Sequence, residues 1–242
     1  MLSEELQKFL WNTKQPWFKV SYKLYWTQLE NIVETKNLKI LDFGSGFGIT
    51  ANYFAKNNEV TATEMIADMI EEREHENNYT QIHGKIEKLK DFDDGYFDVI
   101  VCHNVLEFAD ERAEIVKEFS RILKSGGILS IIKHNRVGIV MRRAVFDNDI
   151  NEALLLLDGG DRTPNAFGKV NYYSPEDLVK WGNNIKIEKI LGVQAFFGLQ
   201  QNNEPKYETE WQDKMFALEM KVCDLEPYKS IAFLHHVLLR KL

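Results

Sequence analysis

The stretch ILDFGSGFGITANYF, residues 40–54, limits most strongly what this chain can fold into. A short apolar segment, 38–43, leads directly into Gly44, Gly46 and Gly48, and a helical pattern follows to about position 56. A strand, a glycine loop and a helix in this order are typical of the first unit of an open parallel sheet, whose ligand lies beyond the strand ends. We therefore expect the loop to hold a cofactor.

The same alternation continues along the chain. Further strands are expected at 59–63, 81–83, 97–103 and 128–132. One helix is expected at 66–77, and another is expected to begin at Asp110 as its N-cap and to end at Gly126 and Gly127. Strands alternating with helices predict an α/β fold with one doubly wound, mostly parallel sheet.

The remaining segments are assigned to the edges of this unit. Residues 1–36 read as two helices separated by Pro16 and are expected to form an N-terminal helical lid on a domain spanning 37–242. A helical insertion is expected after the fifth strand, at about 134–174, and it includes the turn-like DGGDRTPN. Ser174 and Pro175 open a later helix, and 185–198 and 230–240 are expected to be long strands.

Composition excludes several classes of protein. The net charge of −7 opposes a large nonspecific nucleic-acid surface. The two cysteines, Cys102 and Cys223, form no CxxC pattern, so we expect neither a disulfide framework nor a metal site. No apolar run approaches the roughly 20 residues of a membrane span, and the first residues do not read as a signal peptide. We expect a cytoplasmic protein that needs neither metal nor membrane.

Asp42 and Ile49 distinguish between cofactors. Ile49 stands where a dinucleotide fingerprint has its third glycine, which weakens a nicotinamide reading. The Asp42 carboxylate would repel a pyrophosphate but suits a ligand with an ammonium and a sulfonium, such as S-adenosylmethionine. Glu64, at the end of the second strand, is placed to accept hydrogen bonds from ribose hydroxyls.

The pattern DFGSGFG followed by Glu64 resembles class I S-adenosylmethionine-dependent methyltransferases. This resemblance implies that the backbone at Gly44, Ser45 and Gly46 faces the methionine moiety. It also implies that Asp42 helps to hold the ammonium and that Glu64, with Met65 beside it, holds the ribose.

Two further positions follow from the same resemblance. The segment GKIEKL, 84–89, stands where the family reads adenine; because Lys85 replaces the usual Asp, backbone contacts are expected near Ile86 and Glu87. The resemblance also places His103 beside the cofactor.

A narrower similarity is carried by HNVLEF at 103–108, GGILSIIKHN at 126–135 and EPYKSIAFLHHVLLRK at 226–241. These segments resemble the bacterial tRNA carboxymethoxyuridine methyltransferase family, which implies that the acceptor is the carboxylate of a modified wobble uridine. Two features differ. The N-terminal Arg that reaches the cofactor carboxylate in that family aligns with Lys19 or Lys23, and a lysine-rich run in the insertion is replaced by DGGDRTPN.

A carboxylate acceptor is already ionised near pH 7, so it needs a cationic clamp rather than a base. Arg136, Arg142 and Arg143 in the insertion are the candidates, with a solvated helix edge as the alternative. His103 is expected to contact cofactor or substrate, or to be a hydrogen-bonded core histidine; for a hydroxyl or amine acceptor, His103 or His134 could serve as base.

The functional hypothesis is therefore an S-adenosylmethionine-dependent O-methyltransferase, with tRNA or a small molecule as substrate. Five basic and five acidic side chains balance within 134–174, so an electrostatic funnel for tRNA is not evident from the sequence. A small-molecule O- or N-methyltransferase, a noncatalytic cofactor-binding protein and a nicotinamide oxidoreductase remain as alternatives.

Overall fold

The computed structural model describes residues 2–160 and 168–242. The strands are β1 (Lys39–Phe43), β2 (Glu59–Glu64), β3 (Thr80–His83), β4 (Phe97–His103), β5 (Leu123–His134), β6 (Ile185–Val193) and β7 (Leu234–Lys241). The α-helices are α1 (Glu4–Thr13), α2 (Pro16–Glu30), α3 (Ile49–Ala55), α4 (Ala67–Glu71), α5 (Arg112–Ile122), α6 (Arg136–Val145), α7 (Ile150–Leu157), α8 (Pro175–Trp181), α9 (Thr209–Val222) and α10 (Tyr228–Ile231). The short 3-10 segments within these described ranges are η1 (Ile86–Asp91), η2 (Leu106–Phe108), η3 (Phe197–Leu199) and η4 (Glu204–Tyr207).

The strands form one seven-stranded sheet in the order β3-β2-β1-β4-β5-β7-β6. The pairs among β1 to β5 are parallel, and β7 runs antiparallel to both β5 and β6. The order reverses between β1 and β4, which is the point where ligands bind in open α/β sheets. The predicted doubly wound, mostly parallel sheet is confirmed.

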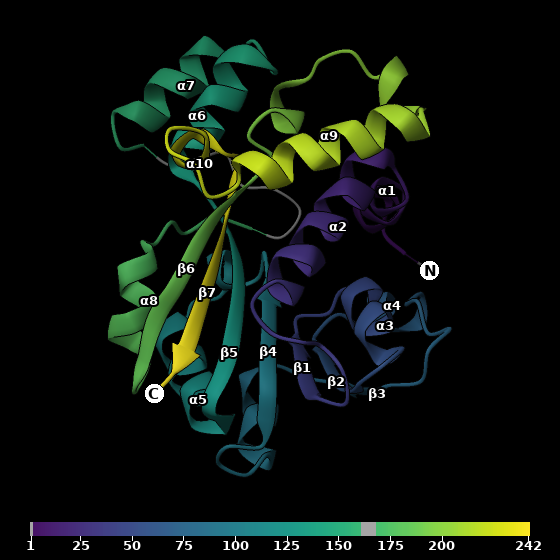
Figure 1. The fold of residues 1–242 in the computed structure, drawn as a ribbon, viewed down its shortest axis with the longest axis vertical. Coiled ribbons are helices and arrows are strands. Elements are labelled where there is room, and N and C mark those ends of the chain that lie inside the picture. Colours follow the sequence, from purple (N-terminus) through teal and green to yellow (C-terminus); the bar gives the residue numbers. More distant parts are fainter. Residues whose placement is uncertain (1, 161–167) are drawn as a thin grey trace.

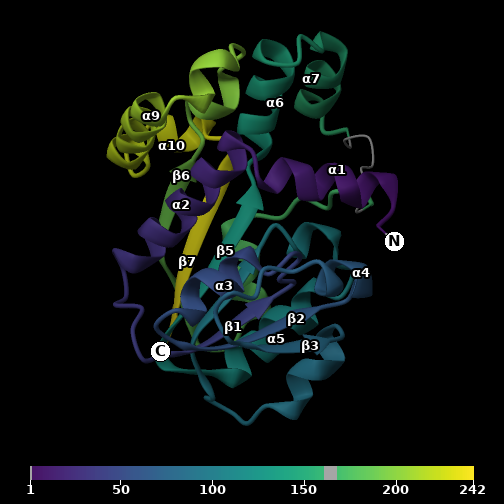
Figure 2. The ribbon, with the colours of Figure 1, turned by 90° about the vertical axis from the view of Figure 1, so that its right-hand side faces the viewer.

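Helices cover both faces of the sheet (Figures 1 and 2). On one face, Phe119 of α5 and Leu178 of α8 pack with strand residues such as Ile100. On the other, Leu29 of α2 and Phe54 of α3 pack with the alternate strand residues. Strands buried on both faces explain why β4 and positions 128–132 of β5 are almost continuously apolar.

Beyond the carboxyl ends of the parallel strands lie α1 and the two helices that directly follow β5. Figure 2 shows α1 crossing above β1 and β2, with α6 and α7 above β5. Pro16 begins α2, and Ser174 caps α8 through a capping box, as the sequence predicts. Within the described ranges, no helix is both long and apolar enough to cross a membrane.

The glycine loop has the backbone that its sequence suggests. Gly44, Gly46 and Gly48 have φ angles of +74°, +56° and +70°, which glycine adopts without strain. A Cβ at Gly44 would lie 2.5 Å from a methyl carbon of Val105. The amides of Gly44 and Ser45 both donate to the Thr63 carbonyl at 2.9 Å, so the loop is tied to β2.

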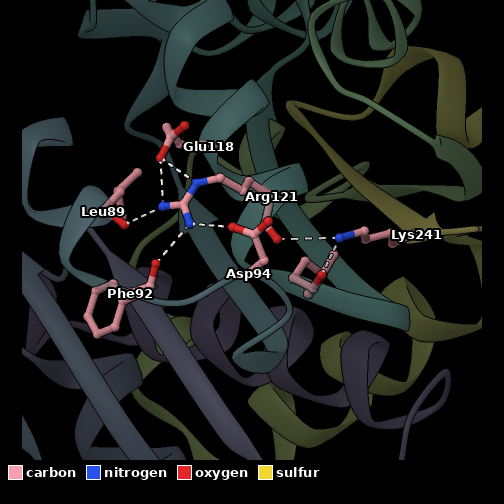
Figure 3. Close-up of polar contacts among 7 residues, drawn as sticks. Leu89, Phe92, Asp94, Glu118, Arg121 and Lys241 are labelled. Carbon is pink, nitrogen blue, oxygen red and sulfur yellow. Dashed lines mark hydrogen bonds and ion pairs between the residues drawn. The ribbon is translucent and has the colours of Figure 1, made fainter.

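Arg121 of α5 holds the connection between β3 and β4 (Figure 3). Its guanidinium donates to the carbonyls of Leu89 and Phe92 at 2.9 and 2.8 Å, and to the carboxylates of Asp94 and Glu118 at 2.8 Å. The carbonyls belong to η1 and the residue after it, so α5 fixes the segment that the family resemblance assigns to adenine.

Several predicted element bounds are wrong. The helix expected at 66–77 is only Ala67–Glu71, because the chain then turns back so that the Glu74 amide donates to the Phe47 carbonyl at 2.8 Å. Asp110 does not cap α5, since Glu111 is the N-cap and makes no side-chain cap bond.

The C-terminal bounds also differ. Gly126 and Gly127 do not end α5; they lie within β5, which begins at Leu123 because this residue already pairs with Phe97 of β4. The two late strands are shorter than expected, ending at Val193 and beginning at Leu234. Most of the DGGDRTPN turn lies outside the described residues.

Candidate functional site

A cavity of about 1050 Å³ lies beyond the carboxyl ends of β1, β2, β4 and β5. Its size exceeds that of most single-ligand pockets, so it can hold a cofactor together with an acceptor. The sequence-predicted site residues that line it are Asp42, Gly44, Ser45, Gly46, Glu64, Met65, Ile86, His103, Arg142 and Arg143. Glu87 and Arg136 are not part of its lining among the described residues.

Asp42 at the end of β1 is a buried carboxyl with an unused acceptor. It is 4% exposed, and its Oδ2 has no hydrogen-bond partner within the described ranges. Burial raises the pKa of this carboxyl to about 7, with a smaller rise from the charge of Glu64. An orphaned buried acceptor costs about 1–3 kcal/mol, so this site is poised to receive a donor from a ligand.

Glu64 at the end of β2 organises two loops at once. Its Oε2 accepts the Gly46 amide at 2.8 Å, and its Oε1 accepts the amides of Met65 and Ile66 at 2.7 and 2.9 Å. An ionised carboxylate can accept about four hydrogen bonds, so Oε2 keeps room for a ligand hydroxyl.

The segment after β3 borders the cavity. Gly84, Lys85 and Ile86 line it, whereas the exposed Glu87 turns back to accept the Lys85 amide at 2.9 Å. That backbone hydrogen bond lowers the pKa of the Glu87 carboxyl.

His103 ends β4 and lines the cavity. Its Nε2 lies 2.8 Å from Ser130 Oγ, and its ring packs edge-on against Tyr25 of α2 at 5.3 Å between centroids. Its Nδ1 is buried and has no partner in the described structure. Burial, and next the neighbouring His236, hold the pKa of His103 well below its usual range, so the imidazole is neutral.

Comparisons with known proteins fit this geometry. Residues 41–131, from β1 through β5, match a family model described as a methyltransferase domain. Residues 41–131 therefore form a methyltransferase domain within the seven-stranded sheet. It is 24% identical over 233 residues to the tRNA 5-carboxymethoxyuridine methyltransferase of Escherichia coli K12, covering 90% of this chain and 87% of that protein.

Two further similarities are more limited: one covers only part of the chain, and the other is a similarity of fold. The ubiquinone biosynthesis O-methyltransferase of Alkalilimnicola ehrlichii is 34% identical over 107 residues, 40% of this chain and 42% of that protein. The crystal structure of an S-adenosylmethionine-dependent methyltransferase from Mesorhizobium loti has the same fold, with a TM-score of 0.60 at 14% identity over 90% of this chain and 98% of that one.

Basic side chains line the cavity where α6 and η4 border it. Arg142 of α6 and Lys206 of η4 both line the cavity and both lie over the Phe146 ring, at 4.8 and 5.5 Å. Lys206 is 3% exposed; burial, and next the charge of Arg142, lower the pKa of its ammonium. Asp147 lies 3.8 Å from Arg142 Nε.

The other two predicted arginines have structural partners. Arg143 forms ion pairs with Asp147 and with Glu152 of α7, the latter at 2.7 Å. Arg136 donates to the carbonyls of Leu156 and Gly160 at 2.7–3.0 Å, which fixes α6 to α7.

The two N-terminal lysines do not reach this site. Lys19 is exposed, and Lys23 pairs with Asp213 at 3.4 Å; neither is in the cavity lining. Other residues from the N-terminal helices line the cavity, among them Asn12, Ser21, Tyr22 and Tyr25.

Glu107 and His134 form a pair that the sequence did not reveal as a unit. Glu107 is 1% exposed, and its Oε1 accepts the His134 amide at 2.7 Å and lies 3.2 Å from His134 Nδ1. An ionised carboxylate only accepts, so it would hold a proton on His134 Nδ1, and in a neutral ring Nε2 would then be the unprotonated nitrogen. This geometry is that of an oriented imidazole base at the cavity wall.

Lys206 is the site residue that the sequence analysis missed most clearly. It lies in NNEPKYE, a polar stretch with no motif, and reaches the cavity only because η4 packs beside α2 and α9. Among the described residues, no cluster of three or more His, Cys, Asp or Glu side chains could hold a metal ion.

Proposed function

We propose that this methyltransferase esterifies a carboxylate, and that the leading acceptor is a carboxylate-bearing modified wobble uridine of tRNA. The observation that carries the proposal is the polarity of the cavity. At one end Asp42 offers an unpartnered acceptor to a cation, and at the other Arg142 and Lys206 offer positive charge to an anion. The tRNA is supported by the similarity to the Escherichia coli relative over 90% of this chain.

The cofactor fits the first end. Its ammonium would lie against Asp42 and the backbone of Gly44, Ser45 and Gly46, and its ribose hydroxyls would donate to Glu64, next to Met65. Its adenine would lie near Lys85 and Ile86, which line the cavity where Glu87 does not, and His103 would border the methionyl part. When bound, S-adenosylmethionine supplies a methyl group on a positively charged sulfur.

The set of basic residues proposed to hold the acceptor differs from the three arginines expected from the sequence. Arg142 and Lys206 line the cavity and share the Phe146 ring, so the acceptor carboxylate would be oriented by these two side chains. The Lys206 ammonium is held in place because it donates to the Gln200 carbonyl and, at 2.9 Å, to Asn203 Oδ1. An ionised carboxylate needs no base, so the residues contribute mainly by fixing both reactants in line. The Lys206 ammonium lies over the Phe146 ring and over the ring of the buried Phe197, at 5.5 and 5.4 Å.

Label transfer from methyl-labelled cofactor tests this function. We expect label in tRNA that carries the free carboxylate nucleoside, and the label should be released by mild alkali because it is a methyl ester. Alkali-stable label would contradict a carboxylate acceptor. Label in small carboxylic acids but not in tRNA would contradict the tRNA.

Arg142→Gln is expected to raise the KM for the labelled acceptor about 10–100-fold, the usual cost of losing one charge-assisted hydrogen bond. Binding of S-adenosylhomocysteine, measured by calorimetry, should not change. Arg240→Gln, which breaks a surface pair with Glu188, is the matched control and should leave the KM unchanged. Equal effects of both substitutions would contradict the clamp.

Glu64→Gln is expected to weaken S-adenosylhomocysteine about 10–100-fold. The amide keeps the side-chain shape, but its NH₂ group would face the amides that the carboxylate now accepts, and the glycine loop would loosen. Calorimetric titration beside Glu71→Gln, an exposed residue of α4, measures the effect. Unchanged affinity in Glu64→Gln would remove this residue from the cofactor site.

A second candidate function is methylation of a hydroxyl, and the Glu107–His134 pair favours it. A hydroxyl acceptor must lose its proton, and His134 Nε2 is available to take it. In that case His134→Gln would abolish most turnover and the label would resist alkali. With a carboxylate acceptor, the same substitution should change turnover less than tenfold.

A further inference from the structure

Two buried acceptors without partners lie on one face of adjacent strands. Asp42 of β1 pairs with Val101 of β4, and His103 follows two residues later, so both side chains project to the same side of the sheet. Strand spacing and rise place their Cα atoms about 8 Å apart. Both Asp42 Oδ2 and His103 Nδ1 lack a hydrogen-bond partner in the described structure.

His103 is the first member of a buried hydrogen-bond chain. Its Nε2 lies 2.8 Å from Ser130 Oγ, and Ser130 Oγ lies 2.8 Å from Nε2 of His236. His236 Nδ1 lies 2.9 Å from Gln28 Oε1, and Gln28 Nε2 donates to the Gly192 carbonyl at 3.0 Å. The chain crosses β4, β5 and β7 beneath α2, and Ser130 and His236 are fully buried.

The carbonyl at the far end determines the direction of every bond. Gly192 can only accept, so Gln28 must present its NH₂ group to it and its oxygen to His236. The His236 Nδ1 must then carry a proton. In a neutral ring, Nε2 of His236 is therefore bare and accepts the hydroxyl proton of Ser130.

The same logic fixes His103. Since the Ser130 hydroxyl hydrogen is used on His236, its oxygen must accept from His103, whose Nε2 therefore carries the proton. Nδ1 of His103 is left as a bare nitrogen. The reverse direction would need an imidazolium at His236, and burial lowers the pKa of that ring to about 3.

We propose that His103 Nδ1 is a fixed hydrogen-bond acceptor for the ammonium of the cofactor, beside Asp42 Oδ2, and that Ser130, His236 and Gln28 are positioning residues that keep it so. This inference rests on the proposed function, which puts the methionyl end of the cofactor next to Asp42. The family resemblance already implies that His103 borders the cofactor; the new element is its fixed tautomer, which explains why this cavity-lining histidine is connected to three buried polar residues.

The chain matters because an imidazole can present either a donor or an acceptor. A proton on Nδ1 would oppose an ammonium, which can only donate. Locking the proton on Nε2 removes that alternative before the ligand arrives, so no rearrangement is needed on binding.

The histidine tautomers give a direct test on the unaltered protein. Nitrogen-detected NMR of labelled imidazoles should show His103 protonated at Nε2 only and His236 protonated at Nδ1 only, and addition of S-adenosylhomocysteine should shift the His103 Nδ1 signal. A proton on Nδ1 of His103, or a His103 signal that the ligand leaves unmoved, would overturn the proposal.

Ser130→Ala tests the positioning role. We expect it to weaken S-adenosylhomocysteine about tenfold but to leave 5′-methylthioadenosine, which lacks the amino-acid part, unchanged. The matched control is Ser120→Ala, another buried serine, whose hydroxyl donates to the Val116 carbonyl of α5 at 2.8 Å. Equal weakening of the two ligands, or equal effects of the two substitutions, would contradict positioning.

These results are separable from the acceptor hypothesis. The binding measurements involve no acceptor, so failure of the labelling experiment leaves them interpretable. If Asp42→Asn does not weaken S-adenosylhomocysteine, the placement of the ammonium is wrong, whatever tautomers NMR finds.

Discussion

Asp42→Asn is expected to weaken S-adenosylhomocysteine binding about 10–100-fold while making the protein more stable at pH 8. Asparagine keeps the shape of the side chain but removes the charge that would hold the cofactor ammonium, and charge-assisted hydrogen bonds contribute about 1.5–3 kcal/mol. The ionised carboxylate is buried without a partner for Oδ2, so its removal should raise the free energy of unfolding by about 2–4 kcal/mol.

The pH dependence has a defined sign. The pKa of Asp42 is about 7 in the folded chain and near 3.8 when unfolded, so between these values the folded state binds more protons. Its contribution to the free energy of unfolding therefore falls as pH rises from about 4 to 7 and is fully unfavourable above 7. An ammonium beside the carboxyl would lower that pKa, so cofactor binding below pH 7 should release a proton and strengthen with pH, by at most about tenfold per unit.

Calorimetry of ligand binding in two buffers of different ionisation enthalpy measures the released proton, and the Asp42→Asn variant should release none.

The contribution of Asp42 to stability is obtained by subtracting the free energy of unfolding of the variant from that of the wild type at each pH. The subtraction is needed because the contribution of His236 changes with pH in the opposite direction. Its pKa is lowered to about 3, so its stabilising contribution is present above about 6.5 and is lost as pH falls. Asp68→Asn, at the start of α4, is the control. A variant that binds as tightly as wild type, or unfolds more easily at pH 8, would contradict this role of Asp42.

The first half of the fold could be predicted because the apolar runs, the glycine loop and the polar residues at the strand ends all indicate the same parallel sheet. β4 begins and ends where its apolar run does, and Asp42 and Glu64 end neighbouring strands because β1 and β2 pair in register. When the register of two strands is known, residues at their carboxyl ends are placed without any knowledge of the loops.

The acceptor end could not be predicted because distant segments decide it. Whether Arg143 is a clamp depends on Glu152 of α7, and this contact follows from how α6 and α7 pack rather than from helical spacing. Lys206 comes from a short 3-10 turn 64 positions beyond Arg142, and no periodicity connects them. Glu107 and His134 meet because the end of β5 passes over η2.

Gly138 gives the clearest case in which sequence and structure predict opposite results. It stands inside α6, where alanine would by propensity alone stabilise a helix by about 1 kcal/mol. A Cβ at this position would lie 2.0 Å from the Ala232 carbonyl oxygen and 2.7 Å from Phe233 Cα. Both neighbours are backbone of the segment leading into β7, so they cannot move away as a flexible side chain could.

The contact is part of how α6 is fixed. The Asn135 side chain donates to the carbonyls of Ser230 and Ala232, both at 2.8 Å, immediately before the helix begins. Displacing α6 at Gly138 would strain these bonds and shift Arg142, one turn further along.

Gly138→Ala is therefore expected to destabilise the protein by about 1–3 kcal/mol, the usual cost of overpacking, which lowers Tm by about 2–12 °C for a chain of this length. The KM for the acceptor found by labelling should rise, whereas S-adenosylhomocysteine affinity should stay within about twofold, because its proposed site lies at β1 and β2. Val137→Ala, at an exposed neighbouring position of the same helix, controls for helix composition. A Gly138→Ala protein with unchanged or higher Tm would show that α6 does not need this close approach, and its role in holding the cationic end of the cavity would then be wrong.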